Sequence, residues 1–205
     1  MMRRNRGCCW VLLFISVLAA SCALGAADIP CDQVHAAAHI ARADSLGALA
    51  EEKKTAGGYI VEIVSAFRAF ELQPRSRVLA ADLLGEIPSD ETQQGLVLSL
   101  DSLMCDGEPV AEMEALARIQ YHLPRMLARA VELAPEYMKA YVKYSLISVR
   151  DPHSDYAIQM QRVCRNRYQE FTKAVAALPE ADRKWFMSDV FDPKRCRAIA
   201  LPEAD

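Results

Sequence analysis

Apolar residues recur every three or four positions along most of the chain, and prolines and glycines interrupt this spacing at intervals. Two such stretches are Ile60, Ile63, Val64, Phe67 and Phe70, and Leu96, Leu100, Leu103 and Met104. An α-helix has about 3.6 residues per turn, so side chains with this spacing lie on one helix face and can be buried together. The sequence therefore predicts an all-α protein made of antiparallel helical hairpins.

Break signals divide the chain after its signal region into about eight predicted helices, the first of which begins near Asp32. Asp90, followed three residues later by Gln93, resembles a capping box and indicates a helix start. Pro124 lacks an amide donor and clashes with the preceding turn, so it should kink or split its helix. The remaining boundaries fall at Gly57 with Gly58, Pro74, Gly85 with Pro88, Gly107 to Pro109, Pro135, Pro152 and Pro179.

Residues 1–25 have the three parts of a secretory signal peptide. Three arginines precede an apolar stretch from Trp10 to Ala20, and small residues follow at 25–27. The apolar stretch is short for a membrane-spanning helix, which needs about 20 apolar residues. We therefore expect residues 1–25 to direct export and to be removed, leaving 26–205 as a single all-helical domain in the periplasm.

Lipidation at Cys22 is the alternative to ordinary cleavage near residues 25–27. The context from Leu18 to Cys22 resembles a lipobox, although the large aliphatic residue lies one position too far from the cysteine. The mature protein would be held at a membrane only if Cys22 carried lipid. Ordinary cleavage is therefore the favoured route.

The charge balance argues against a nucleic-acid or anionic-membrane surface. Removal of the signal peptide lowers the number of Lys and Arg from 24 to 21 while all 27 Asp and Glu remain, so the mature chain is acidic. A nucleic-acid surface needs clustered Lys and Arg. The locally basic C-terminal part, which includes Arg162, Arg167 and Lys184, could face an acidic partner, but its interleaved Asp residues favour a solvated outer face.

Four cysteines remain after the signal peptide: Cys31, Cys105, Cys164 and Cys196. In an oxidising compartment an even number of cysteines indicates disulfides, and four cysteines allow three pairings. If the helix containing Cys164 turns back at Pro179, Cys164 and Cys196 reach similar heights on antiparallel neighbours. The sequence therefore predicts two stapling disulfides, Cys164 to Cys196 and Cys31 to Cys105.

One window, residues 135–171, resembles a tetratricopeptide repeat. Tyr141 stands at the family's tryptophan position, Tyr144 at its leucine, and Ala157 and Cys164 at small positions, after the fitting Pro135. Four positions depart from the family pattern: Ser145, Ser148, Gln161 and Gln169. The resemblance implies a degenerate repeat solenoid, but a compact helical bundle with one repeat-like hairpin is the favoured interpretation.

Packing inside this window can be predicted from residue size. The small residues Ala140 and Ala157 should let two helices approach closely, while Tyr141 and Tyr144 fill the groove between them. The two tyrosines are therefore the candidate partner-binding residues.

His35 and His39 form the most metal-like spacing in the sequence. Residues four apart lie one turn above each other on a helix, so the two imidazoles could bind one zinc or copper ion. A zinc site needs at least three protein ligands, and Cys31 could be the third only as a free thiol. Two partly exposed helix histidines are the simpler interpretation.

No arrangement of residues indicates catalysis or a cofactor. His122 and His153 stand apart from any nucleophile motif, and the pair Gly57 and Gly58 lacks the residues that follow in a phosphate-binding loop. Acidic pairs such as Asp151 with Asp155 are typical of solvated helix faces. No catalytic residue and no cofactor is therefore predicted.

Three functions fit these features. The first is a secreted protein-binding or adaptor protein that grips another protein or peptide and has no catalytic activity. The second is a periplasmic inhibitor or immunity-type protein. The third is a metal-binding protein that uses His35 and His39. An exposed apolar groove would favour the first function, a flat or protruding face the second, and a pocket with converging ligands the third.

Overall fold

The computed structural model describes residues 29–103, 110–148, 154–187 and 196. Within these residues the chain forms ten α-helices and one 3₁₀ turn and contains no strand, so the all-α prediction is confirmed. The elements are α2 (Cys31–Arg42), α3 (Leu46–Ala56), α4 (Tyr59–Leu72), α5 (Arg77–Gly85), α6 (Glu91–Leu98), α7 (Val110–Leu133), η1 (Pro135–Tyr137), α8 (Met138–Ser148), α9 (Asp155–Asn166), α10 (Tyr168–Ala176) and α11 (Glu180–Trp185).

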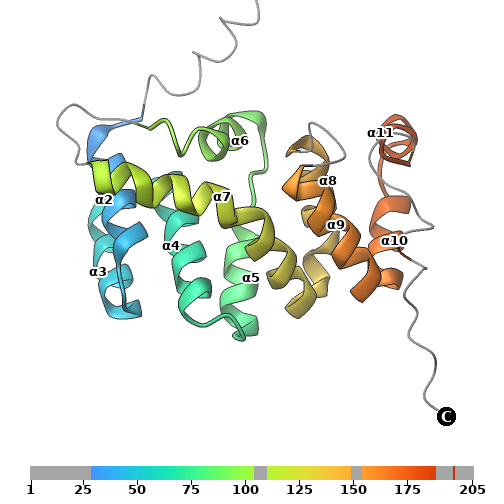
Figure 1. The fold of residues 1–205 in the computed structure, drawn as a ribbon, viewed down its shortest axis with the longest axis horizontal. Coiled ribbons are helices and arrows are strands. Elements are labelled where there is room, and N and C mark those ends of the chain that lie inside the picture. The colour runs from blue at the N-terminus through green and yellow to red at the C-terminus, as the bar shows by residue number, and fades with distance from the viewer. Residues whose placement is uncertain (1–28, 104–109, 149–153, 188–195, 197–205) are drawn as a thin grey trace, which may run out of the picture.

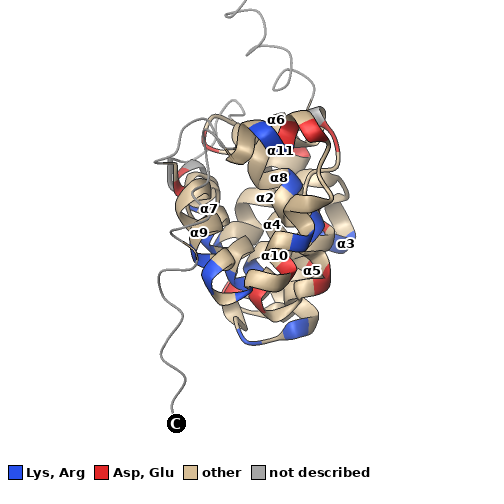
Figure 2. Ribbon diagram, turned by 90° about the vertical axis from the view of Figure 1, so that its right-hand side faces the viewer, with Lys and Arg blue, Asp and Glu red and all other residues tan. Residues whose placement is uncertain are grey.

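The helices pack in two layers. Helices α3, α4 and α5 lie side by side in one layer, which η1, α8 and α10 continue, while α2, α7 and α9 form the other layer (Figure 1). The view from the C-terminal end shows α7 and α9 on one side and α3, α5 and α10 on the other (Figure 2). Helix α7 contacts α2, α5 and α9, so it joins the two ends of the molecule.

The core lies between these layers. Helix α4 is buried on nearly every side, and its large apolar side chains include Phe67 and Phe70, exposed by 1% and 0%. Helix α2 faces it with an alanine run, of which Ala37 and Ala38 are fully buried. Small side chains let helix axes approach closely, so α2 fits between α4 and α7.

Several predicted boundaries are confirmed. Helix α4 ends just before Pro74 and α5 ends at Gly85. Asp90 caps α6, since its carboxylate accepts a hydrogen bond from the Gln93 amide at 2.9 Å. The Gln93 side chain accepts a hydrogen bond from the Ser89 amide, also at 2.9 Å. The reciprocal bond of the capping box therefore comes from the residue before the N-cap rather than from the N-cap Asp90 itself.

Two predicted helices are each broken into two. The first segment divides at Ala43, because Ser45 caps a new helix by accepting a hydrogen bond from the Ala48 amide at 3.4 Å. The segment after Pro152 divides at Arg167, between α9 and α10. Neither position holds proline or glycine, so the sequence carried no strong break signal there.

Pro124 does not split its helix. Helix α7 runs through it for 24 residues and changes direction partway along its length (Figure 1). Neighbouring helices on both sides hold α7 in place. Of the two outcomes predicted for Pro124, the structure therefore excludes a break.

The turn between α3 and α4 requires glycine. Gly57 and Gly58 have φ values of 54° and 120°, which residues with a Cβ atom rarely adopt. A Cβ atom on Gly58 would also lie 2.3 Å from Gln33 Oε1. Gly58→Ala should therefore lower the free energy of unfolding by about 1–3 kcal/mol.

Gly95 provides the matched control for this substitution. It lies inside α6, and a Cβ atom there would meet nothing within 4 Å. Gly95→Ala should raise the free energy of unfolding by about 0.5–1 kcal/mol, because alanine favours the helix. Chemical denaturation of both variants checks the prediction, and a loss of the same size in both would contradict it.

Candidate functional site

A groove follows the seam between α8 and α10 and ends at α11. It consists of two hollows of about 560 Å³ and 310 Å³ that share Lys139 and Ala177. We call it the α8–α10 groove. Its lining residues are Pro135, Glu136, Met138, Lys139, Lys143, Leu146, Ile147, Glu170, Lys173, Ala174, Ala177, Leu178, Pro179, Asp182 and Trp185.

Helix α8 forms one wall because its two faces differ. Lys139, Lys143 and Ile147 are four residues apart and share the face that lines the groove. Tyr141 and Tyr144 belong to the opposite, buried face. The tyrosines therefore fix α8 in the core while the lysines and Ile147 remain accessible.

Helices α10 and α11 form the other wall. Ala174 of α10 and Ala177, directly after α10, line the groove, and their small side chains leave space between the helices. Pro179 begins the turn into α11, which carries Trp185. Ile147 and Trp185 are large apolar residues that are 52% and 42% exposed. The end of the groove near α11 therefore presents apolar surface to solvent.

Two carboxylates of the groove are already paired with arginines outside it. Glu136 binds Arg77 at 3.0 Å, and Glu170 lies 3.7 Å from Arg167. The pKa of Glu136 is lowered, first by a hydrogen bond from its own backbone amide and then by Arg77. Both acids therefore have their own counter-charges.

A separate hollow of about 670 Å³ opens on the layer that contains α3, α4 and α5. Its border at Tyr137 adjoins the α8–α10 groove through η1. Burial raises the pKa of Glu86 in its lining, and repulsion from Glu62 adds to the shift. Its lining residues are Leu46, Leu49, Ala50, Lys53, Ser65, Ala66, Ala69, Leu79, Ala81, Asp82, Gly85, Glu86 and Tyr137.

Tyr141 and Tyr144, the predicted partner-binding residues, lie in the core. Each is 1% exposed, so neither ring can touch a partner in this conformation. Ala140 was predicted to lie between helices but is exposed, whereas Ala157 is buried as expected. The orientation of α8 could not be predicted from the sequence, because both of its faces carry apolar residues.

A cluster of hydroxyl groups is buried around these tyrosines. Tyr144 Oη lies 3.1 Å from Tyr156 Oη, and the two rings meet edge to face. Burial raises the pKa of both groups. It also raises the pKa of Tyr141, and the neighbouring Ser145 hydroxyl offsets part of this shift without reaching regular hydrogen-bond geometry.

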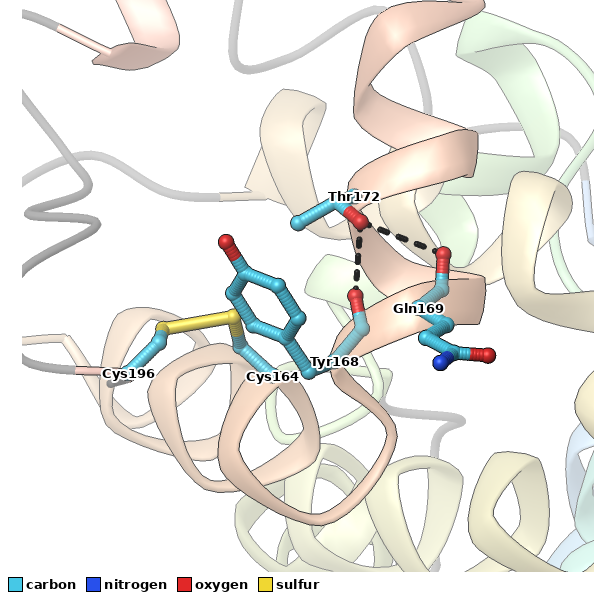
Figure 3. Close-up of a disulfide and its surroundings, with 5 residues drawn as sticks. All are labelled: Cys164, Tyr168, Gln169, Thr172 and Cys196. Atoms are coloured by element: carbon cyan, nitrogen blue, oxygen red, sulfur yellow. Dashed lines mark hydrogen bonds between the residues drawn. A yellow bond between two sulfur atoms is a disulfide. The ribbon is translucent and has the colours of Figure 1, made fainter. Parts of the chain in front are cut away.

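The predicted disulfide between Cys164 and Cys196 is present, with the two Cα atoms 5.8 Å apart (Figure 3). The predicted reason for it was wrong. The helix of Cys164 ends at Asn166 rather than continuing to Pro179, so the bridge reaches back past α10 to α9. Tyr168, at the start of α10, lies beside it (Figure 3).

Cys31 is disulfide-bonded, and its predicted partner Cys105 lies outside the described residues. Cys31 therefore cannot serve as a thiolate ligand for His35 and His39. His35 is partly exposed and His39 is exposed on α2. In the described part of the chain no three His, Cys, Asp or Glu side chains converge as a metal site would require.

Two arginines of the basic C-terminal part are engaged by Glu132 of α7. Arg162 binds the Glu132 carboxylate at 3.0 Å, and Arg167 donates to the Glu132 carbonyl oxygen at 2.6 Å. These residues tie α9 and α10 to α7. The lysines of the α8–α10 groove were not singled out from the sequence, where they look like an ordinary solvated face.

Comparison of the chain with protein families, with curated proteins and with solved structures finds no match. Cys22 and the predicted signal peptide lie outside the described residues. Among the residues described, no helix has the length and apolar character needed to cross a membrane. The α8–α10 groove is therefore the feature on which a functional proposal can rest.

Proposed function

We propose that this chain is an exported helical binding protein that holds a segment of another protein in the α8–α10 groove. The observation that carries the proposal is the apolar end of the groove, where Ile147 and Trp185 are exposed beside a hollow of about 560 Å³. Exposed apolar surface in a concave site is typical of binding sites, and tryptophan is enriched among residues that dominate binding energy.

The helix order supports a repeat-like architecture for the second half of the chain. Helices α7, α8, α9 and α10 alternate between the two layers, and α8 and α10 line the groove together. Stacked helical repeats use one layer in this way. In the first half, consecutive helices α3, α4 and α5 share one layer instead. We therefore propose a bundle that continues into a degenerate, tetratricopeptide-like stack.

Export to the periplasm is part of the same proposal. The bridge between Cys164 and Cys196 supports it, because disulfides persist in oxidising compartments. The signal-peptide pattern of residues 1–25 points the same way.

Photocrosslinking tests the proposed function. A photoreactive amino acid at position 147 should capture a protein in the exporting cell. The same amino acid at Tyr121, which is 62% exposed on α7 in the other layer, should not. The captured protein, identified by mass spectrometry and purified, should bind the chain in calorimetry. Ile147→Asp should weaken that binding by about tenfold or more, since it places a charge in an apolar contact.

Two results would contradict the proposal. One is equal capture from positions 147 and 121. The other is binding of the purified partner that Ile147→Asp leaves unchanged, which would place the contact elsewhere on the molecule.

A further inference from the structure

Three lysines give the α8–α10 groove a positive charge on a chain that is negative overall. Lys139 and Lys143 lie on α8 and Lys173 lies on α10, and all three are exposed. No ion pair within the described residues involves any of them, whereas Glu136 and Glu170 are paired with arginines. Asp182 is the remaining acidic group of the lining.

Charged and apolar groups are unevenly distributed along the groove. Lys139 borders both hollows, and Lys173 lines only the hollow near η1. The hollow near α11 holds Ile147, Leu178 and Trp185 together with Lys143 and Asp182. Lys143 lies between the ends, one helical turn from Lys139, which corresponds to a rise of about 6 Å. A partner that matches this order needs apolar side chains at one end and negative charges at the other.

We infer that the groove binds an acidic amphipathic segment of another protein, with its apolar side chains between Ile147 and Trp185 and its carboxylates on Lys139, Lys143 and Lys173. This inference rests on the proposed function and specifies the partner. Lysine ammonium groups on a groove rim favour carboxylates through charge complementarity, which guides encounter and sets orientation. The concave apolar end favours a protein segment over a flat anionic surface.

The inference can be tested without a known partner. The test is selection from a random library of twelve-residue peptides displayed on phage. The full chain, purified from an exporting host, should enrich peptides that combine apolar residues with an excess of Asp and Glu. The variant Lys139→Glu/Lys143→Glu/Lys173→Glu should lose this bias or favour basic peptides. Arg75→Glu/Arg125→Glu/Arg129→Glu is the matched control, because these exposed cations lie outside the groove lining and outside α11, and it should keep the acidic bias.

An enriched peptide then gives a quantitative measurement through Trp185 fluorescence, and Trp185→Phe should abolish the signal, because the other tryptophan, Trp10, lies in the expected signal peptide. Replacing all three groove lysines by Gln should weaken binding by about tenfold at low salt. The difference should shrink to about twofold in 0.5 M salt, because exposed charges are screened. An equal effect of salt on the Gln variant and on the unchanged chain would overturn the inference.

The outcomes separate the two proposals. In one outcome, the selection enriches peptides without an acidic bias, and Ile147→Asp abolishes that enrichment. This result overturns the inference and leaves the proposed function standing. No enrichment, or enrichment indifferent to Ile147→Asp, overturns both. If only a chain that ends at Cys196 enriches peptides, the groove of the full chain is occupied by its own residues 197–205. If the chain associates with itself through the groove, the occupant is a second copy of the chain. Either result overturns a separate partner.

Discussion

Raising the pH from 10 to 11 is expected to lower the free energy of unfolding by about 3 kcal/mol through three buried tyrosines. Tyr141, Tyr144 and Tyr156 are responsible, because burial raises the pKa of each above its usual value of 10. In the unfolded chain the same groups ionise near pH 10. Each tyrosine that stays protonated in the folded protein contributes about 1 kcal/mol to the loss over this interval.

The sign follows from the direction of the shift. The folded-state pKa lies above the unfolded-state pKa, so the stabilising contribution is complete below pH 10. It is lost as the pH rises from 10 through the folded-state pKa values. Tyr59 adds to the same loss, because burial and then repulsion from neighbouring groups raise its pKa as well. Its hydroxyl donates to the Glu86 carbonyl oxygen at 2.7 Å.

Guanidinium unfolding followed by helical circular dichroism at pH 8, 10 and 11 measures this loss. Tyr141→Phe removes one buried ionisable group and should reduce the loss by about 1 kcal/mol. Tyr121→Phe is the control, since the Tyr121 side chain is 62% exposed and its surroundings change little on unfolding. Unchanged stability between pH 9 and 11, or the same effect from both substitutions, would contradict the prediction.

Helix type was predictable from the sequence because it depends on local spacing, and boundaries were predictable where proline, glycine or a capping residue marks them. The break at Arg167 depends instead on a contact distant in sequence. Its guanidinium donates to the carbonyl oxygen of Glu132 in α7, which fixes the chain where α9 meets α10. A local pattern cannot contain that information.

The groove could not be predicted for a related reason. Its walls come from α8 and α10, and which face of α8 is buried depends on helices that pack against it. Tyr141 and Tyr144 were expected to fill a groove between two helices and also to contact a partner, but both rings are buried in the core. Ile147 with Lys139 and Lys143 forms a four-residue pattern that indicates the exposed face only once the buried face is known.

Removal of the bridge between Cys164 and Cys196 is expected to lower the free energy of unfolding by about 3–4 kcal/mol. The bridged residues are 32 positions apart, and a cross-link over a loop of this length restricts the unfolded chain by about that amount. Cys164→Ala/Cys196→Ala is the suitable variant, because it leaves no free thiol and leaves Cys31 unchanged. Denaturation of the oxidised proteins measures the difference. A loss below about 1 kcal/mol would show that the bridge contributes little or is not formed.

Helix α11 should keep its native position when the bridge is removed, because other contacts hold it in place. Phe186 directly follows α11, is fully buried, and packs against Phe171 of α10 with ring centres 6.3 Å apart. If the bridge acts on the unfolded chain, Trp185 emission in the native variant should match that of the unchanged protein. Phe186→Ala should instead shift Trp185 emission to the red and lower the free energy of unfolding by about 3–5 kcal/mol. A red shift in the cysteine variant would show that the bridge holds the native wall of the groove and would contradict an effect confined to the unfolded chain.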